Sequence, residues 1–444
     1  MLLSALFRPA TLVAFLLIPS LPAEAQSSGE SIRGASIPGD SVRSRFLAEA
    51  ETMLQRPDVQ RAVQHLASSD SATLRHQREL TEIPAPPFHE QARAREFLRR
   101  LTLAGADTVW LDREGNALGL RQGTVGSRTV VISGHLDTVF PAGTDVRVRM
   151  RGDTLRAPGI ADDGRGLAVI LAVLGALHEV DIRTRDHLLV VGTVGEEGLG
   201  DLRGVKHLFR SGASPIHAFL SVDGSGFHGV TNGALGSVRY RVTVRGPGGH
   251  SWGDFGMAHP AHALARAVTE LDDEARRFTA SAPPSSYSVG RMGGGRSVNA
   301  IPDEVWMEVD LRSESQAHLM ALDSVLHRAV RGAVEEENRT RRSGSPLEAH
   351  MDRIGLRPSG MVSPATPFVQ RAMAATILLG GDPVPGISST DANVPISLGV
   401  PAVTLGGGGD GGGAHSLDEW YVDRDGFRGA QRVFLLAVLE AGLP

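Results

Sequence analysis

The segment TVVISGHLDTV, residues 129–139, decides the fold. Its first five residues are apolar or small without alternation, which is typical of a strand buried on both faces of a sheet. Three further runs share this character, namely HLLVVGT at 187–193, AFLSV at 218–222 and PAVTL at 401–405. The run GLAVILAVLGALHEV at 166–180 indicates a buried helix between the first two strands. Apolar strands separated by helices predict an α/β fold with a mostly parallel sheet that helices cover on both faces.

The sequence pattern changes between about Gly236 and Arg357. SVRYRVTVR at 237–245 alternates like a half-exposed strand. The order that follows is helix, strand, strand, helix, strand, and β-α-β-β-α-β is typical of a ferredoxin-like α+β unit. The expected elements are a helix over 260–275, strands over 287–291 and 305–312, a helix over 316–336 and a strand over 346–354. We therefore expect residues 236–357 to be inserted between two parts of one catalytic domain, 26–235 and 358–444.

The composition is that of a globular protein and excludes several chemistries. The 444 residues are 41% hydrophobic and 21% charged, and the net charge of −5 argues against nucleic-acid binding. There is no cysteine, so thiol nucleophiles, disulfides and Cys-bound zinc are excluded. A tightly bound transition metal must therefore use His, Asp and Glu. Lys206 is the only lysine, and its helical setting gives no sign of Schiff-base chemistry.

The N-terminus predicts export. Arg8 precedes the apolar stretch 12–18, and Ala23-Glu24-Ala25 forms a small-x-small cleavage site, so residues 1–25 have the pattern of a signal peptide. The apolar stretch is too short to span a membrane, and no later segment approaches the roughly 20 apolar residues that a span needs. We expect a periplasmic or extracellular protein without a membrane span.

Acids and histidines follow the ends of the predicted strands or precede the buried helix. The carboxyl ends of parallel strands meet at one edge of a sheet, where α/β proteins bind their ligands. Side chains that are far apart in the sequence should therefore meet there. The candidates are His135, Asp137, Asp162, Asp163, Glu196, Glu197, Asp223 and His415.

This set of side chains suits a pair of divalent cations. Such a site needs one shared carboxylate, two further ligands for each ion and an open coordination position. A carboxylate beside the metal should act as general base. Glu196 and Glu197 are adjacent and point apart in extended chain, so one can bind metal while the other accepts a proton. Asp137 is close enough in sequence to orient His135.

The motifs resemble the M20 family of metallopeptidases over about residues 75–440. The family pattern G-H-x-D-x-V, D-D, E-E, an acidic strand end and H-S-x-x-E is similar to Gly134–Val139, Asp162-Asp163, Glu196-Glu197, Asp223 and His415–Glu419. The resemblance implies a zinc-exopeptidase-like catalytic domain and two Zn²⁺ ions, although Co²⁺ or Mn²⁺ suits the same ligands. It implies that Asp162 bridges the ions, with His135 and Asp223 on one and Glu197 and His415 on the other. Glu196 would be the general base, and Asp137 would support His135.

The insert also resembles part of this family. GPGGHS at 246–251 is similar to the segment that opens the family's lid, or dimerisation, domain, so we refer to residues 236–357 as the lid. The resemblance implies that His250 stabilises the oxyanion in the active site of a partner subunit, and hence a homodimer. SVNAIP at 297–302 and DLR at 310–312 resemble substrate-holding stretches, which implies substrate binding by Asn299 and Arg312. Arg312 would bind a carboxylate in bidentate fashion.

The substrate class stays open between two kinds of amide. STDAN at 389–393 and Asp223 resemble the tripeptidase-T-like and dipeptidase branches, which favours short peptides. An N-acyl amino acid is the alternative on the same scaffold. The departure Gly164-Arg165, where many members have Lys-Gly, indicates a different entry into the helix.

Three other interpretations compete. GHSWG at 249–253 spells G-x-S-x-G, so Ser251 would be the nucleophile of a serine hydrolase, but this leaves the carboxylate cluster unexplained. Residues 406–413 contain G-x-G-x-x-G but lead to His415 rather than to a helix, which favours a wall at the substrate's end over a dinucleotide site. A non-catalytic peptide-binding relative would be expected to lack Glu196. Sensitivity to a chelator separates the first of these from a metalloenzyme.

Overall fold

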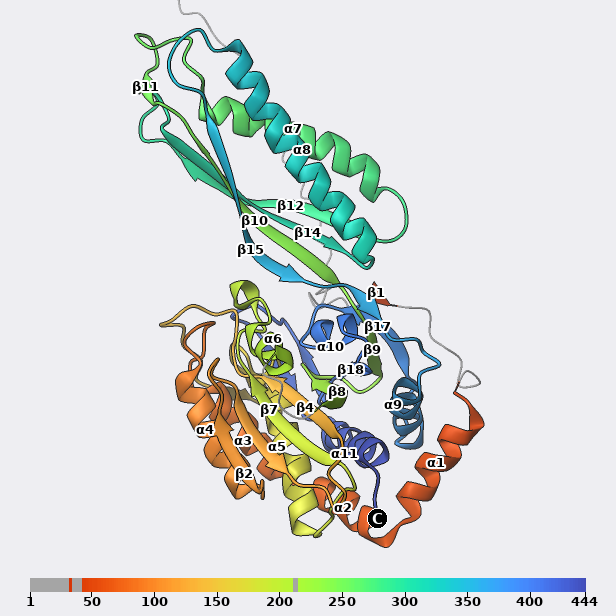
Figure 1. Ribbon diagram of the computed structural model, residues 1–444. Coiled ribbons are helices and arrows are strands. Elements are labelled where there is room, and N and C mark those ends of the chain that lie inside the picture. The colour runs from red at the N-terminus through yellow and green to blue at the C-terminus, as the bar shows by residue number, and fades with distance from the viewer. Residues whose placement is uncertain (1–31, 34–41, 211–214) are drawn as a thin grey trace, which may run out of the picture.

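The computed structural model describes residues 32–33, 42–210 and 215–444. The predicted signal segment, 1–25, lies outside the described residues. The chain forms an α/β body and an elongated second body that rises from it, the lid (Figure 1). Across the described ranges, no helix has both the length and the apolar character that a membrane crossing requires.

The α/β body is built on a large sheet whose centre is parallel. Strand β4 pairs in parallel with β7 and β8, and β8 pairs in parallel with β18, whereas the outer strands β3 and β2 are antiparallel. This confirms the predicted mostly parallel α/β fold. In sheet order the strands are β1 (Ile32–Arg33), β17 (Val384–Ser388), β9 (Gly229–Ala234), β18 (Ala402–Leu405), β8 (Ile216–Val222), β4 (Thr129–His135), β7 (His187–Thr193), β3 (Ala117–Arg121) and β2 (Thr108–Leu111), with β16 (Gly360–Met361) on β9.

Helices cover both faces of this sheet because its central strands are apolar on both sides. In β4, Val130 and Ile132 face a core shared with the larger set of helices, and Val131 faces the opposite core, as the two-residue period of a strand requires. The larger set is α1 (Ser44–Gln55), α2 (Pro57–Ser68), α3 (Asp70–Thr81), α4 (Gln91–Leu103), α5 (Gly164–Glu179), α9 (Pro367–Leu378) and α11 (Phe427–Ala441). The other face carries α6 (Arg203–Arg210) and α10 (Asn393–Ser397).

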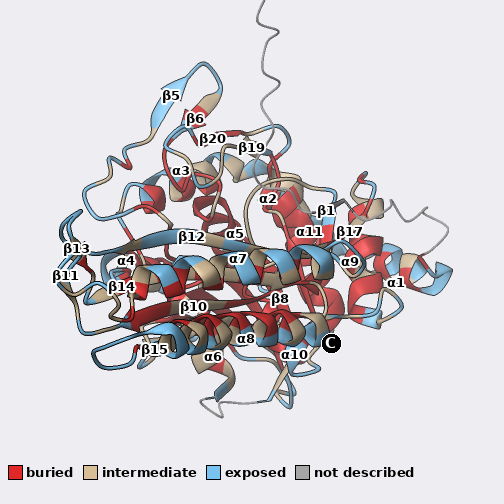
Figure 2. Ribbon diagram, turned by 90° about the horizontal axis from the view of Figure 1, so that it is seen from above, coloured by how far each residue is buried: buried red, intermediate tan, exposed pale blue. Residues whose placement is uncertain are grey.

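The lid has the predicted β-α-β-β-α-β order and its own hydrophobic core. Its antiparallel sheet has the order β12-β14-β10-β15, and α7 and α8 pack on one face, with outward sides that are largely exposed (Figure 2). The elements are β10 (Gly236–Arg245), α7 (Pro260–Thr279), β12 (Ser285–Gly294), β14 (Glu304–Ser313), α8 (Gln316–Thr340) and β15 (Glu348–Arg357). At the tip, β11 (Gly249–His250) pairs with β13 (Ala300–Ile301). The chain enters and leaves the lid on neighbouring strands, since Ser237 pairs with Arg357.

A second small sheet borders the edge where the predicted ligands lie. It contains β19 (Asp410–Gly412), β20 (Trp420–Val422), β6 (Thr154–Arg156) and β5 (Arg149–Arg151), in that order. Through β6 and β19, this sheet connects the segment that precedes Asp162 with the glycine-rich loop that precedes His415. Behind it, Asp70 of α3 lies close to Arg165, with Asp70 Oδ1 4.0 Å from an Nη2 atom of the guanidinium.

Burial of Asp70 makes stability depend on pH. Burial and the neighbouring Asp423 carboxyl raise the pKa of Asp70 to about 7. The folded protein therefore holds this proton up to about pH 7, whereas an unfolded chain loses it near pH 4. Protonation of Asp70 therefore adds to the free energy of unfolding in full below about pH 4, and this contribution is lost as the pH rises towards 7.

We expect Asp70→Asn to stabilise the protein at pH 8 by on the order of 1–2 kcal/mol and to change it little at pH 4. The difference in melting temperature between variant and wild type, measured at both pH values, checks this. A difference that is equal at pH 4 and pH 8 would contradict it.

Candidate metal centre

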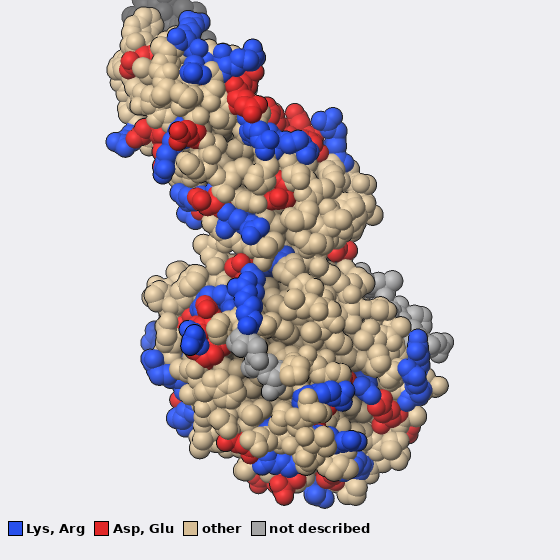
Figure 3. All heavy atoms as spheres, viewed as in Figure 1, with Lys and Arg blue, Asp and Glu red and all other residues tan. Residues whose placement is uncertain are grey.

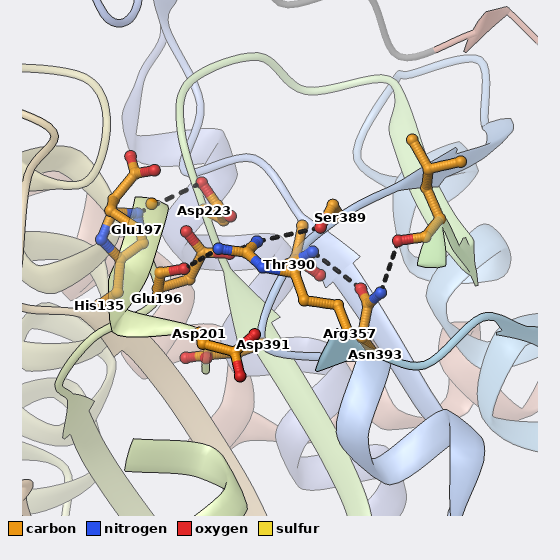
Figure 4. A network of polar contacts seen from close by, with 12 residues as sticks. His135, Glu196, Glu197, Asp201, Asp223, Arg357, Ser389, Thr390, Asp391 and Asn393 are labelled. Carbon is orange, nitrogen blue, oxygen red and sulfur yellow. Dashed lines mark hydrogen bonds and ion pairs between the residues drawn. The ribbon is translucent and has the colours of Figure 1, made fainter. Parts of the chain in front are cut away.

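The five predicted ligands converge at the carboxyl edge of the large sheet. Asp162 lies between two imidazoles, with Oδ1 2.9 Å from His135 Nε2 and Oδ2 3.1 Å from His415 Nε2. Asp223 Oδ1 lies 3.8 Å from His135 Nε2, and Glu197 Oε1 lies 3.0 Å from His415 Nε2. Figure 4 shows His135, Glu197 and Asp223 around this point.

The fold explains why these residues meet. His135 is the last residue of β4, Glu197 follows β7 and Asp223 follows β8, and these strands are adjacent in the sheet. Asp162 immediately precedes the start of α5, whose N-cap is Asp163. The Asp163 carboxylate accepts from the N–H groups of Gly166, at 2.9 Å, and His135, at 3.0 Å, so it ties the helix start to the strand end.

The electrostatics of the cluster fit bound cations. Burial, and then the Asp162 carboxylate, raise the pKa of Glu197 to about 7 and raise that of Asp223 well above its usual value. Hydrogen bonds that the imidazole donates to the Asp162 and Glu197 carboxylates raise the pKa of His415 to about 11. Burial opposes the protonation of His135, but the surrounding carboxylates raise its pKa well above the usual value. Divalent cations would balance this negative charge and keep the imidazoles neutral as ligands.

The ligand atoms also have the right chemistry. His135, Asp162 and Glu197 each offer one nitrogen or oxygen atom, and all three atoms lie within 4.8 Å of one another. Imidazole and carboxylate are the ligands that Zn²⁺ uses in catalytic sites. His135 Nδ1 lies 3.0 Å from the main-chain oxygen of Asp137, so an Nδ1–H donor there would leave Nε2 free for a metal.

Asp137 contributes differently from the sequence-based expectation. Its carboxylate was expected to orient His135, but the main-chain oxygen makes that contact and Oδ1 lies 3.9 Å from Nδ1. The carboxylate instead accepts from the N–H groups of Glu196, at 3.0 Å, and Glu197, at 2.8 Å. The side chain reaches across to the end of β7, because β4 and β7 are neighbours. Asp137 therefore fixes the segment that carries the two glutamates.

Glu196 and Glu197 point to different partners. Glu197 faces His415, whereas Glu196 Oε1 accepts from Arg357 Nη1 at 2.9 Å (Figure 4). Arg357 also donates to the main-chain oxygen of Glu196 and to Ser389 Oγ. Burial alone would lower the pKa of Arg357, but the nearby carboxylates, chiefly those of Glu196 and Glu197, raise it. The ion pair is nearly inaccessible to solvent, with side-chain exposures of 5% and 6%.

Sequence reasoning assigned no role to three residues that shape this site. In the sequence, Arg357 marks only the end of the insert, because its partner Glu196 is 161 residues away in the chain. Glu419 belongs to the His415–Glu419 motif, which by itself indicates no contact for the glutamate. Its carboxylate accepts from the N–H groups of Gly159, Ala161 and Asp162 and so holds the loop that presents Asp162. Asp391 is buried and accepts from Thr193 Oγ1, and burial raises its pKa to about 7.

The predicted substrate residues fall in two places. Arg312 lines the cavity over the cluster, and its Nε donates to Asp310 Oδ2 at 2.7 Å. His250 and Asn299 lie together at the tip of the lid, the end away from the α/β body, where Ala300 pairs with His250 (Figure 1). Neither lines the cavity of its own chain. Ser251 is exposed at the same tip, away from the carboxylate cluster.

A cavity of about 1040 Å³ opens over the cluster and is lined by residues of both the lid and the α/β body. Figure 3 shows the narrow waist where the two bodies meet. One wall is the glycine-rich loop, with Gly409, Gly411, Gly412 and Gly413. The lid side contributes three arginines, Arg239, Arg312 and Arg357. Over the face seen in Figure 3, basic and acidic side chains are interspersed. The cavity is therefore lined both by carboxylates of the predicted metal ligands and by guanidinium groups of the lid.

A histidine and carboxylate cluster at the carboxyl edge of a parallel sheet, beneath a cavity of this size, defines a metal-dependent hydrolase. The chain belongs to peptidase family M20/M25/M40, whose model matches residues 131–439. This confirms the family that the motifs indicated. The members include peptidases and amidohydrolases, and the chain is an enzyme of that class.

The relatives carry both kinds of name. A putative succinyl-diaminopimelate desuccinylase from Mycobacterium tuberculosis is 27% identical over 345 residues, which cover 77% of this chain and 90% of that protein. A tripeptidase structure from Staphylococcus aureus has a TM-score of 0.68 at 21% identity and covers 83% of this chain and 98% of that one. A dinuclear metal-binding M20 peptidase from Bacillus subtilis has a TM-score of 0.61 at 16% identity, with coverages of 84% and 99%. At these identities the structures establish the shared fold.

Proposed function

We propose that the chain is a two-metal exopeptidase that hydrolyses short peptides, with Glu196 as general base. The observation that carries this is the position of Asp162, which presents one carboxylate oxygen to each of two imidazoles. His135 and Asp223 would complete one cation site, and Glu197 and His415 the other. Zn²⁺ suits these ligands, and Co²⁺ or Mn²⁺ is the alternative.

Each residue of the site then has a defined task. When bound, the two cations polarise the scissile carbonyl and lower the pKa of a shared water. Glu196 accepts the proton of the attacking water and passes it to the leaving nitrogen. Because Arg357 binds Oε1 of Glu196, Oε2 is the oxygen that takes the proton. Asp137 holds the main chain of Glu196 in place through its carboxylate.

The second candidate is an N-acyl amino acid amidohydrolase, which the desuccinylase names among the sequence relatives favour. Both substrate classes carry a carboxylate. Arg312 lines the cavity, and its terminal nitrogens offer a bidentate partner for that carboxylate, while its Nε is held by Asp310. We propose that Asn299, together with His250, contacts substrate in the active site of a second subunit.

We also propose a homodimer and export from the cytoplasm. His250 and Asn299 lie at the lid tip, so they would reach a cavity only in another copy of the chain. His250 Nδ1 accepts from the N–H groups of Trp252 and Gly253, which leaves Nε2 to donate to an oxyanion. Export, to the periplasm or outside the cell, is supported by the signal-like pattern of residues 1–25.

A hydrolysis screen tests the proposal. The full chain, loaded with Zn²⁺, is incubated with dialanine, trialanine, N-acetylalanine and N-succinylalanine, with and without EDTA. We expect peptide cleavage that EDTA abolishes and Zn²⁺ restores. Faster turnover of N-succinylalanine would favour the amidohydrolase. Hydrolysis that EDTA leaves unchanged would favour a serine nucleophile, and the absence of any turnover would favour a binding protein.

A further inference from the structure

The lid docks on the segment that carries Glu196. Three groups of the lid contact residues 196–201. Arg357 binds the carboxylate and the main-chain oxygen of Glu196, Arg239 Nη1 donates to the oxygen of Gly198, and the N–H of Leu356 donates to Asp201 Oδ1 at 2.8 Å. The same segment contains Glu197, a predicted metal ligand. The position of the lid and the geometry of the two glutamates are therefore linked through a few hydrogen bonds.

The Asp201 carboxylate connects the lid to helix α6. Its Oδ1 accepts from Leu356, and its Oδ2 accepts from Lys206 Nζ at 2.6 Å, which anchors the carboxylate to α6. Lys206 is the only lysine of the chain, and its side chain is 20% exposed. The Asp201 carboxylate is also among the charges that raise the pKa of Arg357.

The local strand geometry explains why the Leu356 contact matters. β15 is an edge strand of the lid sheet, so one side of its main chain has no strand partner. Its register with β10 shifts between Arg239 and Tyr240, where a bulge leaves Ile354 without a partner. Bulges bend a strand and redirect the side chains beyond them. Asp201 binds the outward N–H two residues after this bulge, directly before Arg357.

We propose that Asp201 is a positioning residue of the active site, which holds the end of β15 so that Arg357 keeps Glu196 in its working orientation. The route runs from Lys206 to Asp201, to the Leu356 amide, to the Arg357 guanidinium and to Glu196. Its kinetic consequence rests on the proposed role of Glu196 as general base. The mechanical link itself does not depend on that role.

The backbone conformation of Asp201 allows its side chain to be removed without strain. Its φ is 53°, in the left-handed region that glycine adopts without strain, so Asp201→Gly removes the carboxylate without a conformational penalty. Asp201→Asn keeps an acceptor for Leu356, but its amide nitrogen cannot accept from Lys206, so this variant retains the first contact and loses the second. Asp181 is an exposed aspartate after α5, with a φ of 55°, so Asp181→Gly is the matched control.

We expect Asp201→Gly to lower kcat by about tenfold to a hundredfold with a KM within about twofold of wild type, because a displacement of about 1 Å costs on this scale. The assay uses the fastest substrate of the four-compound screen. Asp201→Asn, which keeps only the Leu356 contact, should give a kcat between those of Asp201→Gly and wild type, and Asp181→Gly should match wild type. Amide hydrogen exchange should become faster at Leu356 and also at Glu196 and Glu197, whose N–H groups bind Asp137.

Two results would overturn the inference. One is an Asp201→Gly protein in which exchange at Glu196 and Glu197 and the value of kcat are both unchanged. The other is an Asp181→Gly protein as impaired as Asp201→Gly, since Asp181 is no part of the proposed route. If wild type hydrolyses none of the four compounds, the proposed function fails by itself, and exchange at Glu196 and Glu197 alone decides whether the link exists.

Discussion

Glu196→Gln should lower kcat by about 10²–10⁴-fold and leave two metal ions bound per chain. The loss is that expected when a general base is removed. The glutamine retains an oxygen that can accept from Arg357 Nη1, so the buried guanidinium keeps a partner and the fold is preserved. Kinetics on the best substrate and metal analysis of the purified protein measure the two effects.

Glu197→Gln is the comparison that makes this result informative. Glu197 faces His415, not Arg357, so its substitution should lower the metal content as well as the rate. The two variants have the same composition and differ only in which of the two adjacent glutamates is replaced. A Glu196→Gln protein that lacks an ion would exchange the assigned roles of the two glutamates.

Asp162→Asn should reduce the stabilisation by Zn²⁺ by about half or more and lower kcat/KM by at least about a thousandfold. An amide oxygen can serve one cation, but the amide nitrogen cannot bind the other, so the shared ligand is lost. In the wild type, Zn²⁺ at about 100 times its Kd should stabilise the fold by about 2.7 kcal/mol for each ion bound. Melting curves with and without Zn²⁺, together with metal analysis, test this.

Asp410→Asn is a suitable control for Asp162→Asn. Asp410 lines the same cavity but pairs with Arg424, at 3.1 Å, and its side chain is half exposed. The Zn²⁺-induced change in melting temperature should equal that of the wild type. A normal change in Asp162→Asn would show that the ions bind without this carboxylate, and the proposed bridging role would be wrong.

Most of the fold and the convergence of the histidine and carboxylate cluster could be predicted because both depend on local patterns. The strand before His135 is a continuous apolar run, and the strand ends of a parallel sheet share one edge by geometry. The helix–strand order of the lid was also readable from its alternation. His135 ends a strand, and Glu197 and Asp223 closely follow one. Asp162 precedes a helix and His415 follows the glycine-rich loop, so predicting the elements also indicated that these side chains would meet.

The remaining site residues depend on contacts between distant segments, which no local pattern reports. Arg357 is the last residue of a half-exposed strand, and an arginine there is ordinary until the strand is placed against Glu196. The role of Asp137 differed from the expectation because its side chain turns towards β7, a choice set by packing and not by its spacing from His135. His250 and Asn299 were predicted from motifs, and the structure adds that they lie far from the cavity of their own chain.

The adjacency of β10 and β15 makes the catalytic body continuous in space although it is interrupted in sequence. Since Ser237 pairs with Arg357, residues 235 and 358 lie close enough for a short linker to join them. Excising the intervening residues from the gene would therefore yield a single polypeptide with the two halves still in register. The truncated protein would lose Arg357, the partner of Glu196, so a different module grafted at this junction would have to supply a guanidinium group in the same place.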